Sequence, residues 1–292
     1  TAMWRDELGE ERTETVLKAF LRERPVMVRC NESLAERETI LASLESQGVQ
    51  ADPSPYLPGV VELSGYDHLE MLEAFQMGWI QVQDLSSVFA GLAASPQKGD
   101  FVLDVCAAPG GKSLHAADLL RGTGMVEARD LTEKKAELIE ENIQRCGFSN
   151  IRARVWDALV PDETVFGKAD IVLADLPCSG LGIIGKKPDI KLRMTKESAD
   201  DLARLQRQIL SVVWQYVKPG GILVYSTCTI HQAENQENAA WFLKNFPFKP
   251  VDLTKRLGGV LKEDSLKDGW IQFLPGFGPW DGFFLSVMRR EE

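Results

Sequence analysis

Phe101-Val-Leu-Asp-Val-Cys-Ala-Ala-Pro-Gly-Gly-Lys-Ser113 is the stretch that decides the fold of this chain. Its first five residues are mostly apolar and predict a buried strand, and the apolar spacing from Ser113 to Leu120 predicts a helix. Between them lies a Pro-Gly-Gly turn. Glycine lets a backbone approach a ligand closely, and the N-terminus of the following helix offers unpaired N–H groups. The stretch therefore predicts a cofactor site.

Two carboxylates follow the next two predicted strands. Strand 124–129 ends on Asp130, 20 residues after Gly110. A carboxylate belongs there if it is to hold two ribose hydroxyls. Asp157 stands just past the third strand and is expected on the adenine side of the same ligand.

Strands and helices alternate after residue 101, which predicts an α/β fold with a mostly parallel sheet and helices on both faces. The helices are expected at 112–121, 132–146, 198–217 and 233–245. Two late strands are expected to close the sheet as an antiparallel edge pair. The seven predicted strands are 101–105, 124–129, 151–155, 169–174, 221–226, 270–273 and 282–288.

Residues 25 to about 80 predict a small, separate α+β module. Val26–Cys30 and Gly59–Leu63 have the composition of strands. Between them, Ser33–Gln47 predicts a helix with Ser33 as its N-cap. We therefore divide the chain into residues 1–80, a helical segment with an RRM-like module that contacts RNA, and residues 81–292, the cofactor-binding domain.

The composition excludes several classes of protein. No apolar run approaches the roughly 18 residues that span a bilayer. Five cysteines without a C-x-x-C pair argue against a disulfide framework or a structural zinc site, so no metal is expected. No signal peptide is visible, which favours the cytoplasm, and we expect a monomer. The chain starts at Thr1 rather than Met, so the natural N-terminus is expected further upstream.

The net charge of −10 disfavours a nucleic-acid partner unless basic residues gather locally. Basic residues gather in two stretches, Arg22–Arg29 and Gly185–Arg193. The first is interpreted as a solvated surface. The second is close in sequence to the candidate catalytic residues and is interpreted as an RNA contact.

Three kinds of cofactor site can be compared with the glycine turn. The P-loop pattern G-x-x-x-x-G-K-[ST] nearly matches Cys106 to Ser113, but cysteine replaces the first glycine, which gives that loop its freedom around phosphates. The dinucleotide pattern G-x-G-x-x-G fails because Pro109 and Lys112 occupy its positions. A short turn followed by two carboxylates suits a ligand with ribose and adenine but no polyphosphate. These features favour S-adenosylmethionine over a phosphate ligand.

Two cysteines follow neighbouring strands in the predicted sheet, in Asp175-Leu-Pro-Cys-Ser179 and Tyr225-Ser-Thr-Cys228. The carboxyl ends of central parallel strands face the ligand crevice, so Cys178 and Cys228 are expected close to each other and to the methyl donor. A thiolate that adds to carbon 6 of a pyrimidine makes carbon 5 able to attack a sulfonium methyl group. The pair therefore favours methyl transfer to a pyrimidine.

These motifs resemble the RNA 5-methylcytosine methyltransferases of the RsmB/Sun/Nop2 family. The resemblance covers nearly the whole chain and implies a Rossmann-like class I methyltransferase fold. It is closest to the bacterial RsmB branch, which acts on 16S ribosomal RNA and carries an N-terminal NusB-like domain that this sequence lacks. The matching motifs, in order, are Val82-Gln-Asp84, Cys106-Ala-Ala-Pro-Gly-Gly-Lys112, Asp175-Leu-Pro-Cys-Ser179, Lys187-Pro-Asp-Ile-Lys191, Ser226-Thr-Cys228, Glu234-Asn235 and Asp281-Gly-Phe-Phe284.

The resemblance also implies a role for each candidate residue. Cys228 is the implied nucleophile, Cys178 assists release of the product, and Asp175 hydrogen-bonds the target cytosine. Lys112 is implied to lie close to both cofactor and target. The implied cofactor-binding residues are Cys106, Ala107, Ala108, Pro109, Gly110, Gly111, Lys112, Asp130, Asp157 and Asp175.

The sequence thus predicts an enzyme that transfers a methyl group from S-adenosylmethionine to carbon 5 of a cytosine in RNA, with 16S ribosomal RNA as the expected substrate. The base must leave its stack to reach a thiol, so an unpaired cytidine is expected. The N-terminal module and Lys186–Arg193 are expected to hold the RNA. Three alternatives stay open: a tRNA methyltransferase with the same chemistry, an RNA-binding ribosome assembly factor whose methylation is incidental, and a P-loop ATPase.

Overall fold

The structure is a computed structural model that describes residues 2–292. The chain forms two compact units. One comprises Arg24–Asp157, and the other joins the residues up to Glu23 to Ala158–Glu292. The first and last parts of the sequence therefore belong to the same unit.

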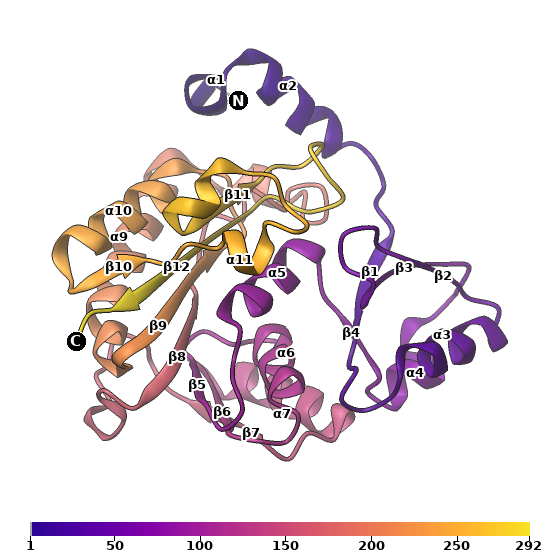
Figure 1. The fold of residues 1–292 in the computed structure, drawn as a ribbon. Helices are drawn as coiled ribbons and strands as arrows, with labels where there is room; N and C mark the ends of the chain where they lie inside the picture. Colours follow the sequence, from indigo (N-terminus) through magenta and orange to yellow (C-terminus); the bar gives the residue numbers. More distant parts are fainter. Residues whose placement is uncertain (1) are drawn as a thin grey trace. The chain divides into compact units, whose positions relative to one another are not determined.

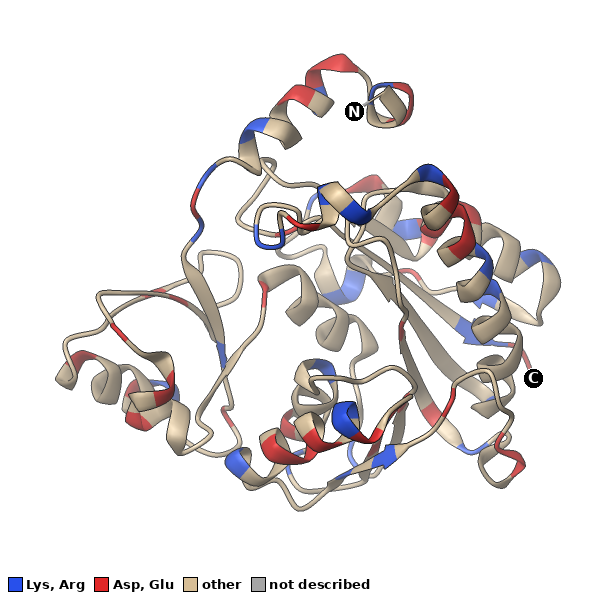
Figure 2. Cartoon of the chain, turned by 180° about the vertical axis from the view of Figure 1, so that it is seen from behind, with Lys and Arg blue, Asp and Glu red and all other residues tan. Residues whose placement is uncertain are grey.

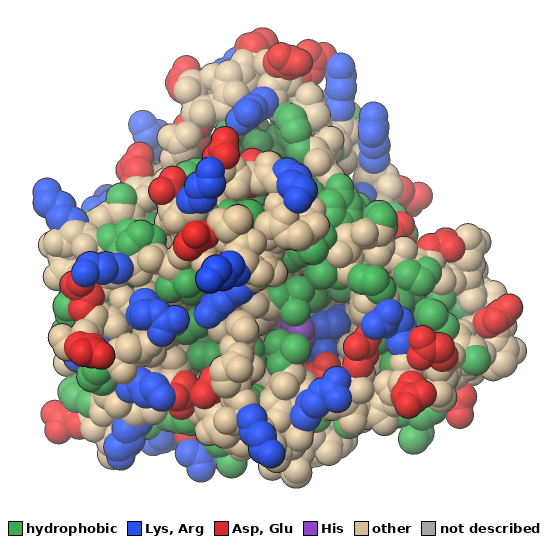
Figure 3. Space-filling view, in the orientation of Figure 1, with side chains coloured by type: hydrophobic (Ala, Val, Ile, Leu, Met, Phe, Trp, Pro, Cys, Tyr) green, Lys and Arg blue, Asp and Glu red, His purple; other side chains and the backbone are tan. Residues whose placement is uncertain are grey.

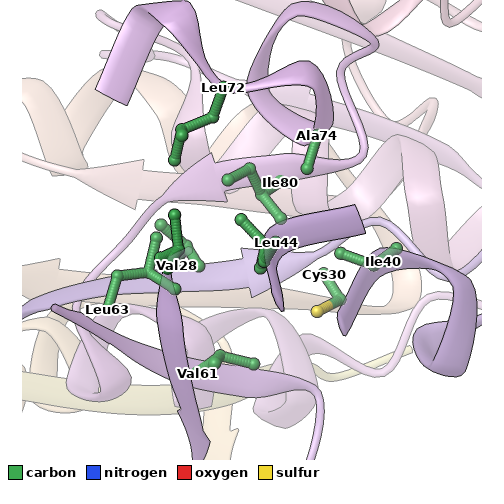
Figure 4. Packing of buried hydrophobic residues seen from close by; sticks show 10 residues of the cluster. Val28, Cys30, Ile40, Leu44, Val61, Leu63, Leu72, Ala74 and Ile80 are labelled. Carbon is green, nitrogen blue, oxygen red and sulfur yellow. The ribbon is translucent and has the colours of Figure 1, made fainter. Parts of the chain in front are cut away.

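The first part of Arg24–Asp157 is an α+β module built from β1 (Val26–Cys30), α3 (Arg37–Ser46), β2 (Gln50–Pro53), β3 (Val60–Ser64), a 3-10 turn (Leu69–Met71), α4 (Glu73–Gln76) and β4 (Ile80–Val82). Its four strands form an antiparallel sheet in the order β2-β3-β1-β4. Val28 and Cys30 of the central β1 are buried in one core with Ile40 and Leu44 of α3 (Figure 4). Each large apolar side chain buried here contributes roughly 1.5–3 kcal/mol, so this core holds the module together.

The second part of the same unit carries the glycine-rich stretch. It is built from α5 (Leu85–Ala94), β5 (Phe101–Asp104), α6 (Gly111–Leu120), β6 (Met125–Asp130), α7 (Glu133–Cys146) and β7 (Ile151–Val155). β6 pairs in parallel with both β5 and β7. Arg145 at the end of α7 donates to the carbonyl oxygens of Phe75 and Ile80 at 2.8 and 3.2 Å, which ties the helix to the module.

The other unit is built from α1 (Ala2–Leu8), α2 (Glu10–Ala19), β8 (Ala169–Asp175), α8 (Ile190–Arg193), α9 (Lys196–Val213), β9 (Val217–Thr227), α10 (Gln236–Asn245), β10 (Phe248–Pro250), α11 (Thr254–Leu257), β11 (Trp270–Phe273) and β12 (Phe283–Arg290). β8 and β9 are parallel, and β12 runs antiparallel along the other side of β9 (Figure 1). β10 and β11 each pair antiparallel with β12. Single 3-10 turns lie at Glu163–Val165, Trp214–Tyr216, Gln232–Glu234 and Asp264–Asp268.

The N-terminal helices α1 and α2 are held in this unit by an apolar cluster. Trp4 of α1 and Val16 of α2 are buried against Ile184, Ile230 and Leu274 from three separate loops. Burial of this surface explains why residues so early in the sequence pack with its second half.

The predicted α/β class with mostly parallel strands is confirmed, and the small N-terminal sheet lies where it was expected. The described residues from Phe101 onwards form eight strands rather than seven, because the short β10 pairs with β12. β11 and β12 are antiparallel partners, as expected. The expected edge pair is wrong in one respect, because β12 also pairs with β9 and β10 and is therefore an interior strand.

The predicted N-cap Ser33 is wrong. α3 begins at Arg37, and no described side chain caps its first turn. Ser33 is engaged elsewhere, because its N–H donates to Asp118 Oδ1 of α6 at 2.9 Å. This bond ties the backbone before α3 to α6.

Acidic and basic residues are interspersed along the chain. Figure 2 shows both kinds on α7, which begins Glu133-Lys-Lys, and Figure 3 shows Lys and Arg side chains among acidic ones on one face. Within residues 2–292, no helix has both the length and the apolar character that crossing a membrane requires.

Candidate functional site

The turn after β5 is braced by a buried acid, Asp104, the last residue of that strand. Ser113 Oγ in α6 donates to Asp104 Oδ2 at 2.6 Å. The N–H of Cys106 donates to Asp104 Oδ1 at 3.4 Å. One carboxylate thus ties together the two ends of the glycine-rich turn, and such charge-assisted bonds hold the turn in one shape.

The backbone of the turn depends on Gly110. Its φ of +107° lies in the region that side chains with a Cβ rarely adopt. The N–H of Gly110 donates to the carbonyl of Ala107 at 2.7 Å, and the Ala108–Pro109 peptide bond is cis. α6 begins at Gly111. The first N–H groups of a helix have no acceptor within the helix, so a helix N-terminus can bind polar ligand groups.

Asp130, at the end of β6, contacts the same turn. Its Oδ2 accepts from the N–H of Ala108 at 2.9 Å. Its Oδ1 accepts from the N–H of Leu131 at 2.8 Å and from Lys135 Nζ at 2.9 Å. A carboxylate has about four lone-pair positions, so a second one on Oδ2 can still accept from a ribose hydroxyl.

Asp157 lies just past β7 and is half-buried. The preceding N–H, that of Trp156, donates to the carbonyl of Asp130 at 2.9 Å, which places Asp157 at the carboxyl ends of β6 and β7. The guanidinium groups of Arg129 and Arg154 lie 5.1 and 4.4 Å from the Trp156 ring, within cation–π distance. The two predicted acids therefore end neighbouring strands of one unit.

In the other unit, Cys178 and Cys228 lie together as expected. Cys178 follows β8, and Cys228 comes directly after β9. Their Sγ atoms are 3.3 Å apart, and both residues are half-buried free thiols. This separation fits a hydrogen bond between sulfur atoms.

The contact makes the two thiols unequal. The hydrogen bond with Cys228, followed by burial, raises the pKa of Cys178 well above its ordinary value. Cys178 therefore keeps its proton at neutral pH and can donate it in a hydrogen bond to the Cys228 sulfur. A donor in that place would stabilise negative charge on the Cys228 sulfur.

Asp175 is the last residue of β8 and lies opposite Ser226 of β9. Ser226 Oγ donates to Asp175 Oδ1 at 2.6 Å, which fixes the carboxylate at the strand ends that also carry the two cysteines. Asp175 is half-buried.

The loop that carries Cys178 is held by a buried carboxylate, Glu234. The side chain of Glu234 has 0% exposure and accepts from the N–H of Ser179 at 2.8 Å, from Ser179 Oγ, and from Gln206 Nε2 at 3.0 Å. Burial raises the pKa of Glu234, and the bonds from Ser179 and Gln206 oppose that rise. Because a buried charge is tolerated only with such donors, the residue next to Cys178 is firmly positioned.

The neighbouring Asn235 holds the loop that carries Cys228. Thr227 Oγ1 donates to Asn235 Oδ1 at 2.5 Å, and Asn235 Nδ2 donates to the carbonyl of Thr229 at 3.0 Å. Thr227 and Thr229 flank Cys228, so one amide side chain fixes the backbone on both sides of the cysteine. Two consecutive residues therefore position both cysteine-bearing loops.

The two loops also meet directly at Gly182. Its N–H donates to the carbonyl of Cys228 at 3.0 Å, and its own carbonyl accepts from the N–H of Gly282 at 2.9 Å. A Cβ on Gly182 would lie 2.0 Å from the Gly282 oxygen and 2.8 Å from the Cys228 oxygen. Only glycine fits at this crossing.

The basic stretch expected to contact RNA is largely exposed. Lys186 forms a salt bridge with Asp281 at 2.6 Å, and Arg193 pairs with Asp189. No acidic partner occurs for Lys187 or Lys191 among the residues that the structure describes. These two lysines are the cations of the stretch best placed to meet a phosphate.

α1 contacts the loop after Cys228. Glu7 Oε1 lies 2.8 Å from His231 Nδ1, and the carbonyl of Glu7 accepts from Gln232 Nε2 at 3.3 Å. Burial acts to lower the pKa of His231, but the hydrogen bond and charge of Glu7 outweigh it, so that the pKa lies above its ordinary value. His231 therefore stays charged to a higher pH than a free histidine.

Sequence patterns do not identify Asp104, Gln206 or His231 as parts of this arrangement. Asp104 carries a local signal, because it is an acid that ends an apolar strand next to the glycine turn. Gln206 and His231 carry none, since their partners Glu234 and Glu7 are 28 and 224 residues away.

The chain matches two profiles of known protein families. The profile described as 16S rRNA methyltransferase RsmB/F matches residues 92–289, and that of a RsmF/B-like ferredoxin-like domain matches residues 1–68. The probable ribosomal RNA small subunit methyltransferase B of Bacillus subtilis is 36% identical over 291 residues, 99% of this chain and 65% of its own length.

Solved structures share the fold. The protein PH0851 is 31% identical, with a TM-score of 0.90, and the match covers 99% of this chain and 64% of that one. NSun6 from Pyrococcus horikoshii, determined with SFG, has a TM-score of 0.87 at 22% identity over 99% of this chain and 97% of its own, a likeness of fold alone. The Rossmann-like methyltransferase fold expected from the sequence is thereby confirmed. The chain spans a little under two thirds of the length of the curated relatives it matches.

Replacing Gly182 with alanine is predicted to disturb the cysteine pair. The new Cβ would overlap the carbonyl oxygens of Gly282 and Cys228, so one of these backbone segments must shift. We expect the free energy of unfolding to fall by about 1–3 kcal/mol, as for other overpacked sites. We also expect slower oxidation of Cys178 and Cys228 to a disulfide by diamide, measured by mass spectrometry.

Gly259→Ala is the matched control, because a Cβ there meets nothing within 4 Å and the backbone φ is ordinary. It should leave both the stability and the oxidation rate unchanged. Equal behaviour of the two variants would show that Gly182 does not position the pair.

The contact between Glu7 and His231 is predicted to make stability depend on pH. The folded-state pKa of His231 is raised above 6.5. The pair therefore contributes its full stability below that pH and loses it as the pH rises through the folded-state pKa. The difference in unfolding free energy between the wild type and Glu7→Gln, measured by urea denaturation from about pH 5.5 to 8.5, should shrink as the pH rises. A difference that stays constant would contradict the ion pair, and Glu11→Gln in the exposed part of α2 serves as control.

Proposed function

The chain belongs to the 16S rRNA methyltransferase RsmB/F family, and on that premise we propose that it transfers a methyl group from S-adenosylmethionine to carbon 5 of a cytosine in RNA. The proposed substrate is 16S ribosomal RNA, for which the matching profile is named, and the proposed compartment is the cytoplasm. The observation that carries the proposal is the 3.3 Å contact between the Sγ atoms of Cys178 and Cys228.

We assign cofactor binding to the turn Cys106–Gly111 with Lys112, Asp130, Asp157 and Asp175. S-adenosylmethionine supplies a reactive methyl group on a positively charged sulfur. The open lone pair of Asp130 Oδ2 suits a ribose hydroxyl, and the N-terminus of α6 suits a carboxylate. Neither feature calls for a polyphosphate, which argues against the P-loop alternative.

Cys228 is the proposed nucleophile. Carbon 5 of cytosine attacks a methyl group poorly by itself. When the Cys228 thiolate adds to carbon 6, a sulfur–carbon bond forms and electron density moves to carbon 5. Carbon 5 would then take the methyl group as the bond between that group and the sulfonium sulfur breaks, which leaves a neutral thioether. Loss of the proton from carbon 5 breaks the sulfur–carbon bond and restores the aromatic ring, so that one hard step becomes several easier ones.

Cys178 and Asp175 serve the same reaction in different ways. The S–H of Cys178 stabilises the Cys228 thiolate before attack and helps the product leave afterwards. Asp175, held by Ser226, is proposed to hydrogen-bond the cytosine near N3 and its amino group. Glu234 and Asn235 touch neither ligand in this scheme and act as positioning residues.

The proposed RNA contact is the exposed pair Lys187 and Lys191. A base must leave its stack to reach Cys228, so an unpaired cytidine is the expected target. Lysines near a flipped nucleotide can hold the flanking phosphates without reading the sequence.

Methylation of purified RNAs tests the function. The protein is incubated with S-adenosylmethionine and either 16S ribosomal RNA or tRNA, and 5-methylcytosine is mapped by bisulfite sequencing. One modified cytidine in 16S ribosomal RNA is the expected result. Modification confined to tRNA would reassign the substrate, and no 5-methylcytosine in either RNA would reject the activity.

Cys228→Ala is predicted to bind S-adenosylmethionine as the wild type does, because the residue is not assigned to the cofactor, and to form no 5-methylcytosine. The loss should be at least about 10³-fold, as for other covalent nucleophiles. Calorimetry measures binding, and incorporation of labelled methyl groups measures turnover. Substantial residual turnover would exclude Cys228 as the nucleophile.

Cys178→Ala is predicted to accumulate a covalent complex with RNA, because attack by Cys228 continues while release is impaired. The complex should persist on a denaturing gel and disappear in the double variant Cys178→Ala/Cys228→Ala. Cys146→Ala, a buried thiol outside the pair, is the matched control and should give no such band. Absence of the band in Cys178→Ala would remove the release role.

A further inference from the structure

A separate cavity of about 220 Å³ lies within the Arg24–Asp157 unit. It is lined by the second half of α6, β1 with the loop after it, the loop before β3, and α5. The glycine-rich turn is at the other end of α6, and none of the residues assigned to cofactor or cytosine lines this cavity.

Arg29 of β1 is a buried cation in this lining, with 3% of its surface exposed. Its Nε donates to Gln83 Oε1 at 2.9 Å, and its Nη1 donates to Asp118 Oδ2 at 3.2 Å. Its Nη2 has no hydrogen-bond partner among the described residues. A guanidinium group buried with an unused nitrogen is costly.

The acids of the lining are already engaged. Asp118 accepts from Arg29 and, through its other oxygen, from the N–H of Ser33 at 2.9 Å. Glu32 forms a salt bridge with Arg37 at 2.6 Å. Neither carboxylate of the lining is therefore left unpaired to serve as an acceptor for Arg29 Nη2.

Two further polar groups of the lining have no charged or hydrogen-bonding partner in the described part of the chain. Arg121, exposed at the end of α6, has no acidic partner among residues 2–292. The Nδ1 atom of His115, a residue 4% exposed, also has no partner there. Burial holds the pKa of His115 well below its ordinary value, so this ring is neutral. With three arginines against two carboxylates, the lining carries one excess positive charge.

We propose that this cavity is a binding site for a phosphate group, either inorganic phosphate or a phosphate of a nucleotide chain. Its oxygens would accept from Arg29 Nη2 and from Arg121, whose planar guanidinium groups suit such anions. A volume of about 220 Å³ equals that of roughly seven water molecules, enough for a phosphate group with a few waters. The proposal does not depend on the methyl-transfer function.

Histidine NMR tests the site, because the chain has only three histidines, His68, His115 and His231. The ring signals of the full chain are followed at fixed pH and ionic strength as inorganic phosphate replaces chloride, and they are assigned with His68→Asn and His231→Asn. We expect a saturable shift of the His115 signals and none for the other two rings. No saturable shift of His115 up to roughly 50 mM phosphate, far above a millimolar dissociation constant, would overturn the proposal.

Arg121→Asn tests the contribution of charge without disturbing the buried pair of Arg29 and Asp118. Arg121 has a φ of +49°, which asparagine tolerates well, so the variant should fold normally. We expect the dissociation constant for phosphate to rise about tenfold, the loss of one charge-assisted hydrogen bond. Lys98→Asn removes the same charge from an exposed position outside the cavity and should have no effect. Equal affinities of Arg121→Asn and the wild type, or equal losses in both variants, would overturn the site.

A short RNA oligonucleotide separates the two sources of phosphate. If the RNA itself shifts the His115 signals and raises the apparent dissociation constant for phosphate, the site takes a phosphate of the RNA backbone. If phosphate binds unchanged in the presence of RNA, the site takes a free phosphate. Both results support the cavity as a phosphate site, and they assign its ligand.

Discussion

The cysteine pair depends on two side chains that follow each other in sequence, Glu234 and Asn235. The buried carboxylate of Glu234 accepts three hydrogen bonds and thereby fixes Ser179. Asn235 forms hydrogen bonds with Thr227 and Thr229 on either side of Cys228. Their partners lie on loops that follow different strands, so the 3.3 Å contact of the sulfur atoms is set by one short segment before α10. Reacting groups must be held to fractions of an ångström, and a buried, fully bonded segment supplies that precision.

Buried carboxylates also hold irregular backbone in the other unit. Asp104 lies under the glycine turn as Glu234 lies under the Cys178 loop, and Asp118 holds the N–H of Ser33. In each case a carboxylate with little solvent contact accepts from a backbone N–H and from a side chain. Irregular backbone is thereby kept in one conformation where strands and helices no longer dictate it.

The sequence alone predicted those features of the fold and the site that depend on short-range patterns. Alternating strands and helices, the glycine turn, and the two cysteines after neighbouring strands all follow from short-range patterns, and the structure has them. Ser33 is not a helix cap because α3 begins only at Arg37, and β10 was missed because three residues carry too little periodicity. Gln206 and His231 could not be found at all, since their roles arise from partners distant in sequence.

The hydrogen bonds of Glu7 with His231 and Gln232 have a consequence for synthesis of the chain. The first helices leave the ribosome long before the loop they pack against, because 224 residues separate Glu7 from His231. At ordinary elongation rates that interval is on the order of ten to forty-five seconds. During it the apolar sides of Trp4 and Val16 lack the surface that later buries them, so this part of the nascent chain is exposed to chaperones until the second half has been made.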